Sequence, residues 1–309
     1  MQTTSLNSSP ISWLMERSNP SVRYWTLVDV LRQPTDAPDA IQTREEISKQ
    51  PIVLQIFKLQ QPGGYWGEDE TKPYTAKGAV GVLNLLYSLG VSPDERTTSG
   101  CDSFLRYSQN ENGGFSMVKT RRSAVFPCTT GEHLGFLVYF GLGDDPRVRK
   151  AFHFLLERMS SEDALICGRY EHRDCLWGAI ASLKGLAVLP NDLRNSRSQL
   201  VIERLANSLL EAPYDFNGEH KRWFTFGVPR AWDLISALYV LVLHGYESHP
   251  QFNKLLELVL QKQDEEGRWI CSSVSRTWPL EKRNQPSKWV TLDVLRTLKT
   301  IGYTFTTGA

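Results

Sequence analysis

The sequence has little of three features that mark specialised classes of protein. It has no uninterrupted apolar run of about 18 residues or more, so no segment is predicted to span a bilayer. The stretch from Met1 to Ser9 has neither a basic nor an apolar region, and no signal peptide is expected. The 309 residues include five cysteines, an odd and sparse number that favours free or metal-bound thiols over a disulfide scaffold. These absences predict a protein of a reducing compartment, the cytoplasm.

A surplus of charge of either sign is also lacking. Lysine and arginine number 35 against 34 aspartate and glutamate residues, which gives a net charge of +1. Because nucleic-acid binding depends on clustered positive charge, no nucleic-acid partner is expected. The apolar fraction of 41% is enough for a sizeable core, and the composition is that of an ordinary globular chain.

The sequence does contain a repeat of roughly 50 residues, which is the length of two helices and their turns. Apolar stretches end in turn signals at Gly90, Gly141, Leu189, Gly245 and Gly302. The first and last long helical segments are also similar to each other. Residues 25–32 read W-T-L-V-D-V-L-R, and residues 289–296 read W-V-T-L-D-V-L-R. Similar ends are expected of an array of repeats that closes on itself.

Each repeat is predicted to contain one apolar inner helix and one more polar outer helix. The inner helices are expected over residues 20–32, 74–89, 128–141, 173–188, 230–245 and 287–302. The outer helices are expected over residues 10–17, 39–60, 96–108, 146–159, 193–211 and 249–263. No segment alternates with a period of two residues, so little or no β-sheet is predicted.

The junctions after three outer helices share a form: a glutamine, a polar turn that contains glycine, and then an aromatic residue. The three segments run from Gln60 to Trp66, from Gln109 to Phe115 and from Gln261 to Trp269. Glycine permits the tight turn, and the aromatic ring is expected to fill the gap to the next helix pair.

These junctions resemble the QW-type motifs of squalene and oxidosqualene cyclases, whose architecture is shared by the β-subunits of protein prenyltransferases. Within that superfamily the chain is most similar to small bacterial and archaeal single-domain proteins. The matching segments are Phe126-Pro-Cys-Thr-Thr-Gly, Cys175-Leu-Trp-Gly, Phe226-Gly-Val-Pro-Arg and Pro286-Ser-Lys-Trp. The resemblance implies an all-α fold, an α/α toroid of six inner and six outer helices. It implies one domain over residues 1–309, with an ordered core from about 10 to 303, and a hydrophobic, isoprenoid-like substrate in the central cavity.

The chain departs from those families in its acidic residues. It contains neither the D-x-D-D motif, which protonates an alkene in class II cyclases, nor a D-D-x-x-D magnesium site for diphosphate. The nearest acidic clusters are 68–70, 144–145 and 264–266. Asp144 and Asp145 are typical of a helix cap, and the third cluster of a solvated turn. The first cluster, residues 68–70, either faces the cavity or belongs to a solvated loop.

A candidate zinc site comes from the middle repeats. Its residues are Cys128, Cys167, His172 and Cys175, which the toroid would place at the same end of adjacent inner helices. Three thiolates and one imidazole are a recurring tetrahedral set for Zn²⁺. Four ligands would make a closed structural site, whereas three would leave a position for substrate or water. The alternative is that the cysteines are buried as small apolar side chains.

Candidate acid–base residues lie on the inner helices. Glu132 and His133 place a carboxylate beside an imidazole, although adjacent helical residues point in different directions. Asp233 recurs with Asp29 and Asp293 in similar helices, as either a catalytic acid or a structural bond to a neighbouring helix.

Candidate substrate-binding residues are aromatic or basic and stand near the starts of inner helices. They are Tyr24, Trp25, Tyr74, Trp177, Arg230, Trp232 and Trp289. Aromatic faces stabilise cations of the kind that cyclisation generates. Two short basic loops, with Arg121 and Arg122 and with Lys221 and Arg222, are either solvated or diphosphate-binding.

The favoured hypothesis is an enzyme, a terpene cyclase-like lyase or isomerase or a prenyltransferase-like transferase. Its partner would be a hydrophobic small molecule. One alternative is a non-catalytic, zinc-stabilised binding or scaffold module, since helical arrays commonly bind peptides and proteins. Another is a zinc enzyme that activates a thiol or water.

Overall fold

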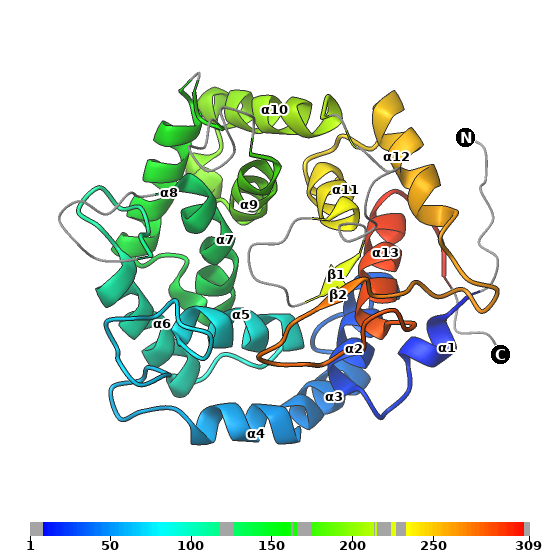
Figure 1. Cartoon of the computed structure of the whole chain (residues 1–309), viewed down its shortest axis with the longest axis horizontal. Helices are drawn as coiled ribbons and strands as arrows, with labels where there is room; N and C mark the ends of the chain where they lie inside the picture. Colours follow the sequence, from blue (N-terminus) through cyan, green and yellow to red (C-terminus); the bar gives the residue numbers. More distant parts are fainter. Residues whose placement is uncertain are drawn as a thin grey trace. The chain divides into compact units, whose positions relative to one another are not determined.

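The computed structural model describes residues 9–117, 126–161, 163–165, 175–212, 214, 224–226 and 233–305 (Figure 1). In this part the chain forms thirteen α-helices, and its one sheet consists of two strands of two residues each. The all-α class and the near-absence of β-sheet are therefore confirmed. None of the described helices is both long enough and apolar enough to cross a membrane. The closure of six helix pairs into one toroid over residues 1–309 stays a prediction.

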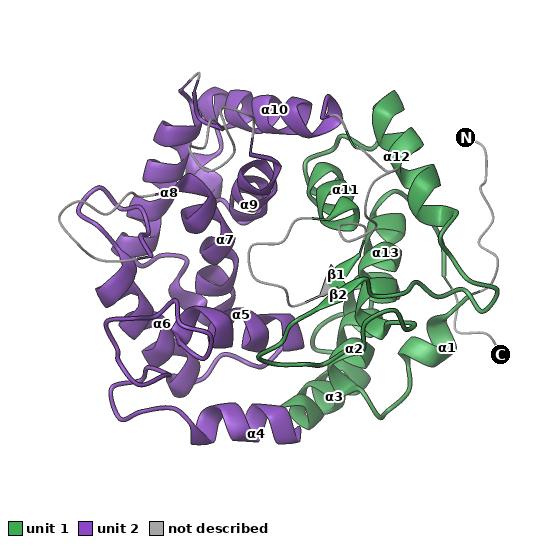
Figure 2. Ribbon diagram, viewed as in Figure 1, with its two compact units in different colours: residues 1–49, 213–309 green, residues 50–212 purple. Residues whose placement is uncertain are grey.

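By its internal contacts the chain divides into two compact units (Figure 2). Unit 1 consists of Met1–Lys49 and Pro213–Ala309, and unit 2 consists of Gln50–Ala212. Unit 1 therefore contains both ends of the chain, and each unit has buried apolar side chains of its own.

Unit 2 contains the helices of the middle repeats. They are α4 (Pro51–Lys58), α5 (Ala79–Leu89), α6 (Glu95–Ser108), α7 (Pro127–Leu137), η2 (Val138–Leu142), α8 (Pro146–Met159), α9 (Leu176–Ala187), η3 (Asn191–Leu193) and α10 (Ser196–Leu210). The inner helices α7 and α9 lie side by side, and the outer helices α8 and α10 pack against them. On α8 one apolar stripe is buried, which consists of Val148, Ala151, Phe152, Leu155 and Leu156.

Unit 1 contains the first and last helices. They are α1 (Ile11–Leu14), α2 (Pro20–Trp25), η1 (Thr26–Val30), α3 (Pro38–Ser48), α11 (Leu234–Leu243), α12 (Pro250–Leu260) and α13 (Lys288–Thr300). The short strands β1 (Thr225–Phe226) and β2 (Ser273–Val274) pair in parallel. Helix α13 packs against α11 and against α2 with its continuation η1, so the similar helices at the two ends of the sequence are neighbours.

Helices begin where the sequence supplies a cap. Asp145 accepts a hydrogen bond from the backbone N–H of Arg147, with Pro146 as the first residue of α8, as the sequence predicts. Asp94 and Thr97 form a capping box at the start of α6. Helix α5 ends at Gly90, whose φ of +79° is the left-handed conformation that glycine permits.

Three predicted helix limits are wrong. The helix expected over residues 39–60 is divided into α3 and α4, because Gln50 is extended before Pro51, which lacks an N–H. The helix expected to begin at residue 74 begins at Ala79, because residues 67–78 form a loop that is closed by a hydrogen bond from Val80 N to Pro73 O. The helix expected over residues 10–17 is confined to the four residues of α1.

The three junctions have one shared geometry. The glycines Gly64, Gly113 and Gly267 have φ values of +82°, +95° and +84°. Two residues after each comes the aromatic residue. The indole N–H of Trp66 donates to Ile56 O at 2.8 Å, and that of Trp269 donates to Val259 O at 2.7 Å. Each indole therefore holds the turn against the outer helix that precedes it.

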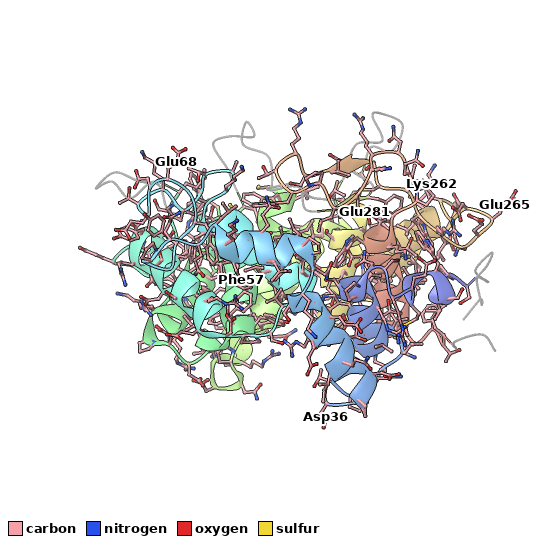
Figure 3. All side chains as sticks on the ribbon, turned by 90° about the horizontal axis from the view of Figure 1, so that it is seen from below. Asp36, Phe57, Glu68, Lys262, Glu265 and Glu281 are labelled. Carbon is pink, nitrogen blue, oxygen red and sulfur yellow. The ribbon has the colours of Figure 1, made fainter. Side chains whose placement is uncertain are left out.

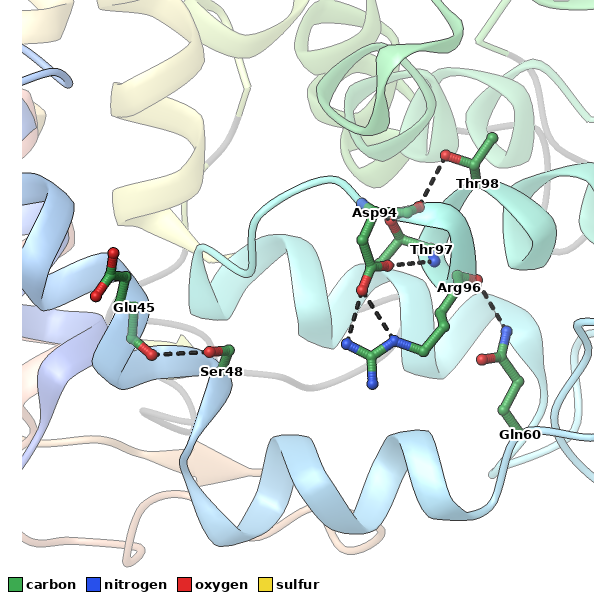
Figure 4. A network of polar contacts seen from close by, with 7 residues as sticks. All are labelled: Glu45, Ser48, Gln60, Asp94, Arg96, Thr97 and Thr98. Atoms are coloured by element: carbon green, nitrogen blue, oxygen red, sulfur yellow. Dashed lines mark hydrogen bonds and ion pairs between the residues drawn. The ribbon is translucent and has the colours of Figure 1, made fainter.

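The glutamine of the junction joins two consecutive outer helices. Gln60 donates through Nε2 to Gly64 O in its own turn at 2.8 Å. The same nitrogen donates to Arg96 O in the first turn of α6, also at 2.8 Å (Figure 4). Gln109 donates in the same way to Gly113 O and to Arg147 O of α8, at 2.8 and 2.7 Å. Counted back from Gly267, the corresponding residue of the third junction is Gln263 and not Gln261, because Gln261 still caps α12.

Candidate functional site

A buried imidazole on α7 is the centre of the candidate site in unit 2. His133 is only 4% exposed. The centroid of its ring lies 5.4 Å from that of Phe104, 5.5 Å from that of Phe136 and 5.7 Å from that of Tyr74. We refer to His133 and these three rings as the aromatic cluster. It places a group that can exchange a proton among aromatic rings, which can stabilise a cation.

The members of the aromatic cluster come from different elements. Phe104 belongs to the outer helix α6, and Phe136 lies three residues after His133 on α7. Tyr74 belongs to the loop of residues 67–78 and is half-buried, so this loop covers the imidazole. Tyr74 was predicted to stand at the start of an inner helix, and its place in the loop is a consequence of the later start of α5.

The carboxyl group predicted to work with His133 has different surroundings. Glu132 is half-buried, whereas His133 beside it is buried. Adjacent residues on a helix point about 100° apart. The aromatic cluster therefore contains the imidazole, whereas the carboxyl group of Glu132 points to a different side of α7.

Helices α7 and α9 approach each other closely because both have glycine at the contact. A Cβ atom on Gly131 would lie 2.5 Å from Ala181 O, and one on Gly185 would lie 2.8 Å from Gly131 O. Real Cβ atoms do not approach a carbonyl oxygen this closely, so both positions require glycine. The contact aligns the first turns of the two helices.

Two of the four predicted zinc ligands meet at these first turns. Cys128 opens α7, and Cys175 caps α9 with its Sγ accepting a hydrogen bond from Gly178 N at 3.3 Å. A Cβ atom on Gly178 would lie 3.4 Å from Cys175 Sγ and 3.8 Å from Cys128 Cβ, so both cysteines lie against one glycine. Cys167 and His172 lie outside the described residues. Within the described residues, no group of three His, Cys, Asp or Glu side chains is arranged to hold a metal. Trp177, on the same turn of α9, is half-buried.

The acidic loop of residues 68–70 belongs to the solvated surface and the outer helices. Glu68 is exposed at the edge of the molecule (Figure 3). Hydrogen bonds from Lys72 and Thr71 lower the pKa of Asp69 to about 2, which makes it an anion at neutral pH. Glu70 accepts a hydrogen bond from the hydroxyl of Tyr107 at 2.6 Å. These contacts are those expected of the second alternative, in which residues 68–70 belong to a solvated loop.

In unit 1, Asp233 is held by three hydrogen bonds. Its Oδ1 accepts from Ser236 N at 2.8 Å and caps α11, while its Oδ2 accepts from the N–H and the hydroxyl of Thr225, both at 2.6 Å. Of the two roles that the sequence left open for Asp233, a catalytic acid or a structural bond, this arrangement is the structural one. It connects β1 to the start of α11. Arg230 and Trp232, predicted nearby, lie outside the described residues.

The aromatic residues predicted in unit 1 pack among its own side chains. Trp289 is 1% exposed and Tyr24 is 2% exposed. Trp25 is half-buried, and its ring centroid lies 5.0 Å from that of Tyr24. The guanidinium of Arg296 lies over Trp25, also at 5.0 Å, so one face of the indole already holds a cation.

Arg296 is the centre of an ion triad that the sequence reasoning missed. Its Nε pairs with Asp29 at 2.7 Å and its Nη1 with Asp293 at 2.9 Å. Burial lowers the pKa of the guanidinium, but the two carboxylates outweigh it and raise that pKa above its usual range. The sequence did contain a signal for this triad, because aspartate and arginine recur at matching positions of residues 25–32 and 289–296.

Glu281 is a second group that the sequence did not reveal. It lies in the loop before α13, where Oε1 is 3.4 Å from Trp289 N. Burial raises the pKa of this carboxyl group, and hydrogen bonds from Trp289 N and Ser287 together with the charge of Lys288 offset the rise only in part. Nothing in the local sequence distinguishes Glu281 from a solvated loop residue.

No family model matches the sequence, and no curated protein matches it. Solved structures with a similar course of the chain include a protein from Actinoplanes, which is 15% identical with a TM-score of 0.48 and coverage of 92% of this chain and 90% of that one. They also include the type II terpene cyclase MstE from Scytonema, which is 14% identical with a TM-score of 0.47 and coverage of 91% and 87%. A variant of that cyclase in complex with its substrate, geranylgeranyl dihydroxybenzoate, has the same identity, a TM-score of 0.48 and coverage of 91% and 86%.

Proposed function

We propose that the protein is a terpenoid cyclase- or prenyltransferase-like enzyme that acts on a hydrophobic, isoprenoid-like substrate. The observation that carries the proposal is the aromatic cluster around His133. A buried imidazole among three aromatic rings combines proton exchange with the stabilisation of positive charge, and cyclisation of an isoprenoid requires both. The chain has no D-x-D-D motif, so the proposal does not use that acid.

In this proposal His133 is the acid–base group, and Phe104 and Phe136 are the rings that face developing charge. Tyr74 is on the loop that covers the imidazole, so substrate entry requires this loop to move. The other two predicted acids are not used in this proposal: Glu132 is half-buried on α7, and Asp233 is the cap of α11.

The test is conversion of isoprenoids by the purified protein. Linear polyprenyl alcohols, polyprenyl diphosphates and squalene are each incubated with the protein, and products are separated by gas chromatography and mass spectrometry. The expected result is a product that boiled protein does not form, and a rate that falls by a factor of about 10² to 10⁴ in His133→Gln.

His153→Gln is the matched control, because His153 is exposed on α8 and outside the aromatic cluster. It is expected to keep the wild-type rate. Equal rates for His133→Gln and His153→Gln would remove His133 from the chemistry, and no conversion of any of these substrates would reject the enzyme itself.

A second candidate function, a zinc-stabilised scaffold or a zinc enzyme, is supported by the two cysteines that meet at Gly178. Two thiolates are the donor type that zinc prefers, and Cys128, Cys167, His172 and Cys175 would hold the ion. With four ligands the ion supplies stability, and with three it supplies a Lewis acid for a thiol or water.

Metal analysis of the purified protein distinguishes this second candidate. About one zinc per chain is expected, with a loss of that zinc in Cys128→Ser and in Cys175→Ser. Cys101→Ser is the control, since Cys101 is buried on α6. A protein without zinc, or one that keeps it in both serine variants, would reject the site.

A further inference from the structure

The side chain of Asn84 connects two inner helices at the imidazole of His133. Asn84 is a half-buried residue of α5, a helix whose other residues are mostly apolar. Its amide nitrogen Nδ2 lies 3.0 Å from Val80 O, one turn earlier on the same helix. The same nitrogen lies 3.4 Å from Nδ1 of His133 on α7. One NH₂ group therefore has two neighbours.

The hydrogen atoms of this NH₂ group determine what each neighbour must be. A side-chain amide nitrogen has two hydrogen atoms and no lone pair to offer. The carbonyl of Val80 can only accept, which fixes the amide orientation, because the opposite orientation would place two oxygen atoms face to face. The second hydrogen then points to Nδ1 of His133, so Nδ1 is an acceptor and carries no proton.

The surroundings of the ring agree with this assignment. A neutral imidazole with an unprotonated Nδ1 has its proton on Nε2. Protonation of both nitrogens would set an N–H of the ring against the N–H of Asn84, in a site that is only 4% exposed.

We propose that Asn84 is a positioning residue that holds His133 as the neutral tautomer with its proton on Nε2. This inference rests on the proposed function and makes it more specific. With Nδ1 bonded to Asn84, His133 enters proton transfer as a neutral imidazole whose one N–H is on Nε2.

The test is the protonation pattern of the histidine rings in ¹⁵N-labelled protein, recorded by long-range proton–nitrogen NMR without any substrate. The His133 signals are identified by their loss in His133→Gln. In the wild type, Nδ1 is expected at the shift of an unprotonated ring nitrogen and Nε2 at that of a protonated one. In Asn84→Asp the carboxylate accepts from the ring, so Nδ1 is expected to move to the protonated shift.

Asn84→Leu removes the amide without offering an acceptor, and it is expected to give a mixture of the two tautomers. His153, exposed on α8, is the internal reference, and its signals are expected to stay unchanged in both variants. A proton on Nδ1 in the wild type would overturn the inference. So would an unchanged pattern for His133 in Asn84→Leu, and the wild-type spectrum decides the matter even when a variant does not fold.

The two proposals fail separately. If the wild type has Nε2–H and Asn84→Asp reverses it, but no isoprenoid is converted, the positioning role stands and the proposed function falls. If an isoprenoid is converted but Nδ1 carries the proton in the wild type, the enzyme stands and the positioning role of Asn84 is wrong.

Discussion

At the scale of single residues, the carboxyl group of Glu281 lies where a negative charge is costly. Burial raises its pKa above the ordinary value of 4.5, and hydrogen bonds from Trp289 N and Ser287, with the charge of Lys288, only partly offset this. The unfolded chain keeps the ordinary value. The stability that this group contributes is therefore complete below pH 4.5 and is lost as the pH rises through the pKa of the folded state.

Glu281→Gln is expected to remove this dependence on pH. The difference in melting temperature, wild type minus variant, should fall as the pH is raised from 4.5 to 8, and each unit of pKa shift corresponds to about 1.4 kcal/mol. Thermal unfolding followed by circular dichroism measures it. Glu265→Gln, at an exposed position that Figure 3 labels, is the control and should give parallel curves. Parallel curves for Glu281→Gln as well would contradict the burial of its carboxyl group.

The residue scale also separates what the sequence could predict about the site from what it could not. His133 was predicted because a histidine on an apolar helix is conspicuous. Asn84 is equally polar on an equally apolar helix, but its contact with His133 spans 49 positions, which a single sequence does not reveal. The packing of Tyr74 on His133 depends on the path of a loop, and loops have no periodicity from which that path can be read.

At the scale of elements, the junction glutamines connect helices that are about 40 residues apart in the sequence. Gln109 ends α6 and donates to Gly113 O in its own turn and to Arg147 O at the start of α8, a residue 38 positions away. The carbonyl groups of a turn and of a helix start need such donors when they are partly buried. One side chain thus fixes both the turn and the next outer helix.

Gln109→Ala is expected to destabilise unit 2 by about 1–3 kcal/mol, because two partly buried carbonyl groups lose their donor. Gln109→Glu should cost more, since a carboxylate in the same place repels both carbonyl oxygens. Urea unfolding measures the change in free energy. Gln55→Ala on the exposed face of α4 is the control and should change it by less than about 0.5 kcal/mol. If Gln109→Glu were as stable as the wild type, the two hydrogen bonds would not hold the junction.

The presence of each helix was easier to predict from the sequence than the residues at which it begins and ends. A glycine with a positive φ follows the inner helices α5, α11 and α13, and each of α6, α8 and α10 begins at a capping residue, so their positions follow from local chemistry. The division of residues 39–60 at Pro51 is also local chemistry, and the apolar spacing on both sides concealed it. The loop of residues 67–78 could not be predicted for a different reason. Its hydrogen bond from Val80 N to Pro73 O forms only in the folded chain.

At the scale of the whole molecule, unit 1 joins the two ends of the chain through Arg296. The ion pair with Asp29 connects residues 267 positions apart, and Thr300 and Lys288 add contacts with Arg32 and Glu16. The similarity of the terminal helices predicted that they would be neighbours. The ion triad explains how they are held: the aspartates of both repeats share one arginine, whose side chain is 16% exposed.

Arg296→Met is expected to lower the free energy of unfolding by about 2–4 kcal/mol, because two half-buried carboxylates lose their shared counter-charge. The N-terminal helices should loosen first, so limited proteolysis should cleave between η1 and α3 faster than in the wild type. The triple variant Asp29→Asn, Asp293→Asn, Arg296→Met also removes the repulsion between the two carboxylates. It should recover at least half of the free energy of unfolding that Arg296→Met loses. Arg197→Met on α10, whose side chain bonds only to Ser160 among the described residues, is the control. A triple variant as unstable as Arg296→Met would show that the loss comes from the packing of Arg296 on Trp25 and not from the charges.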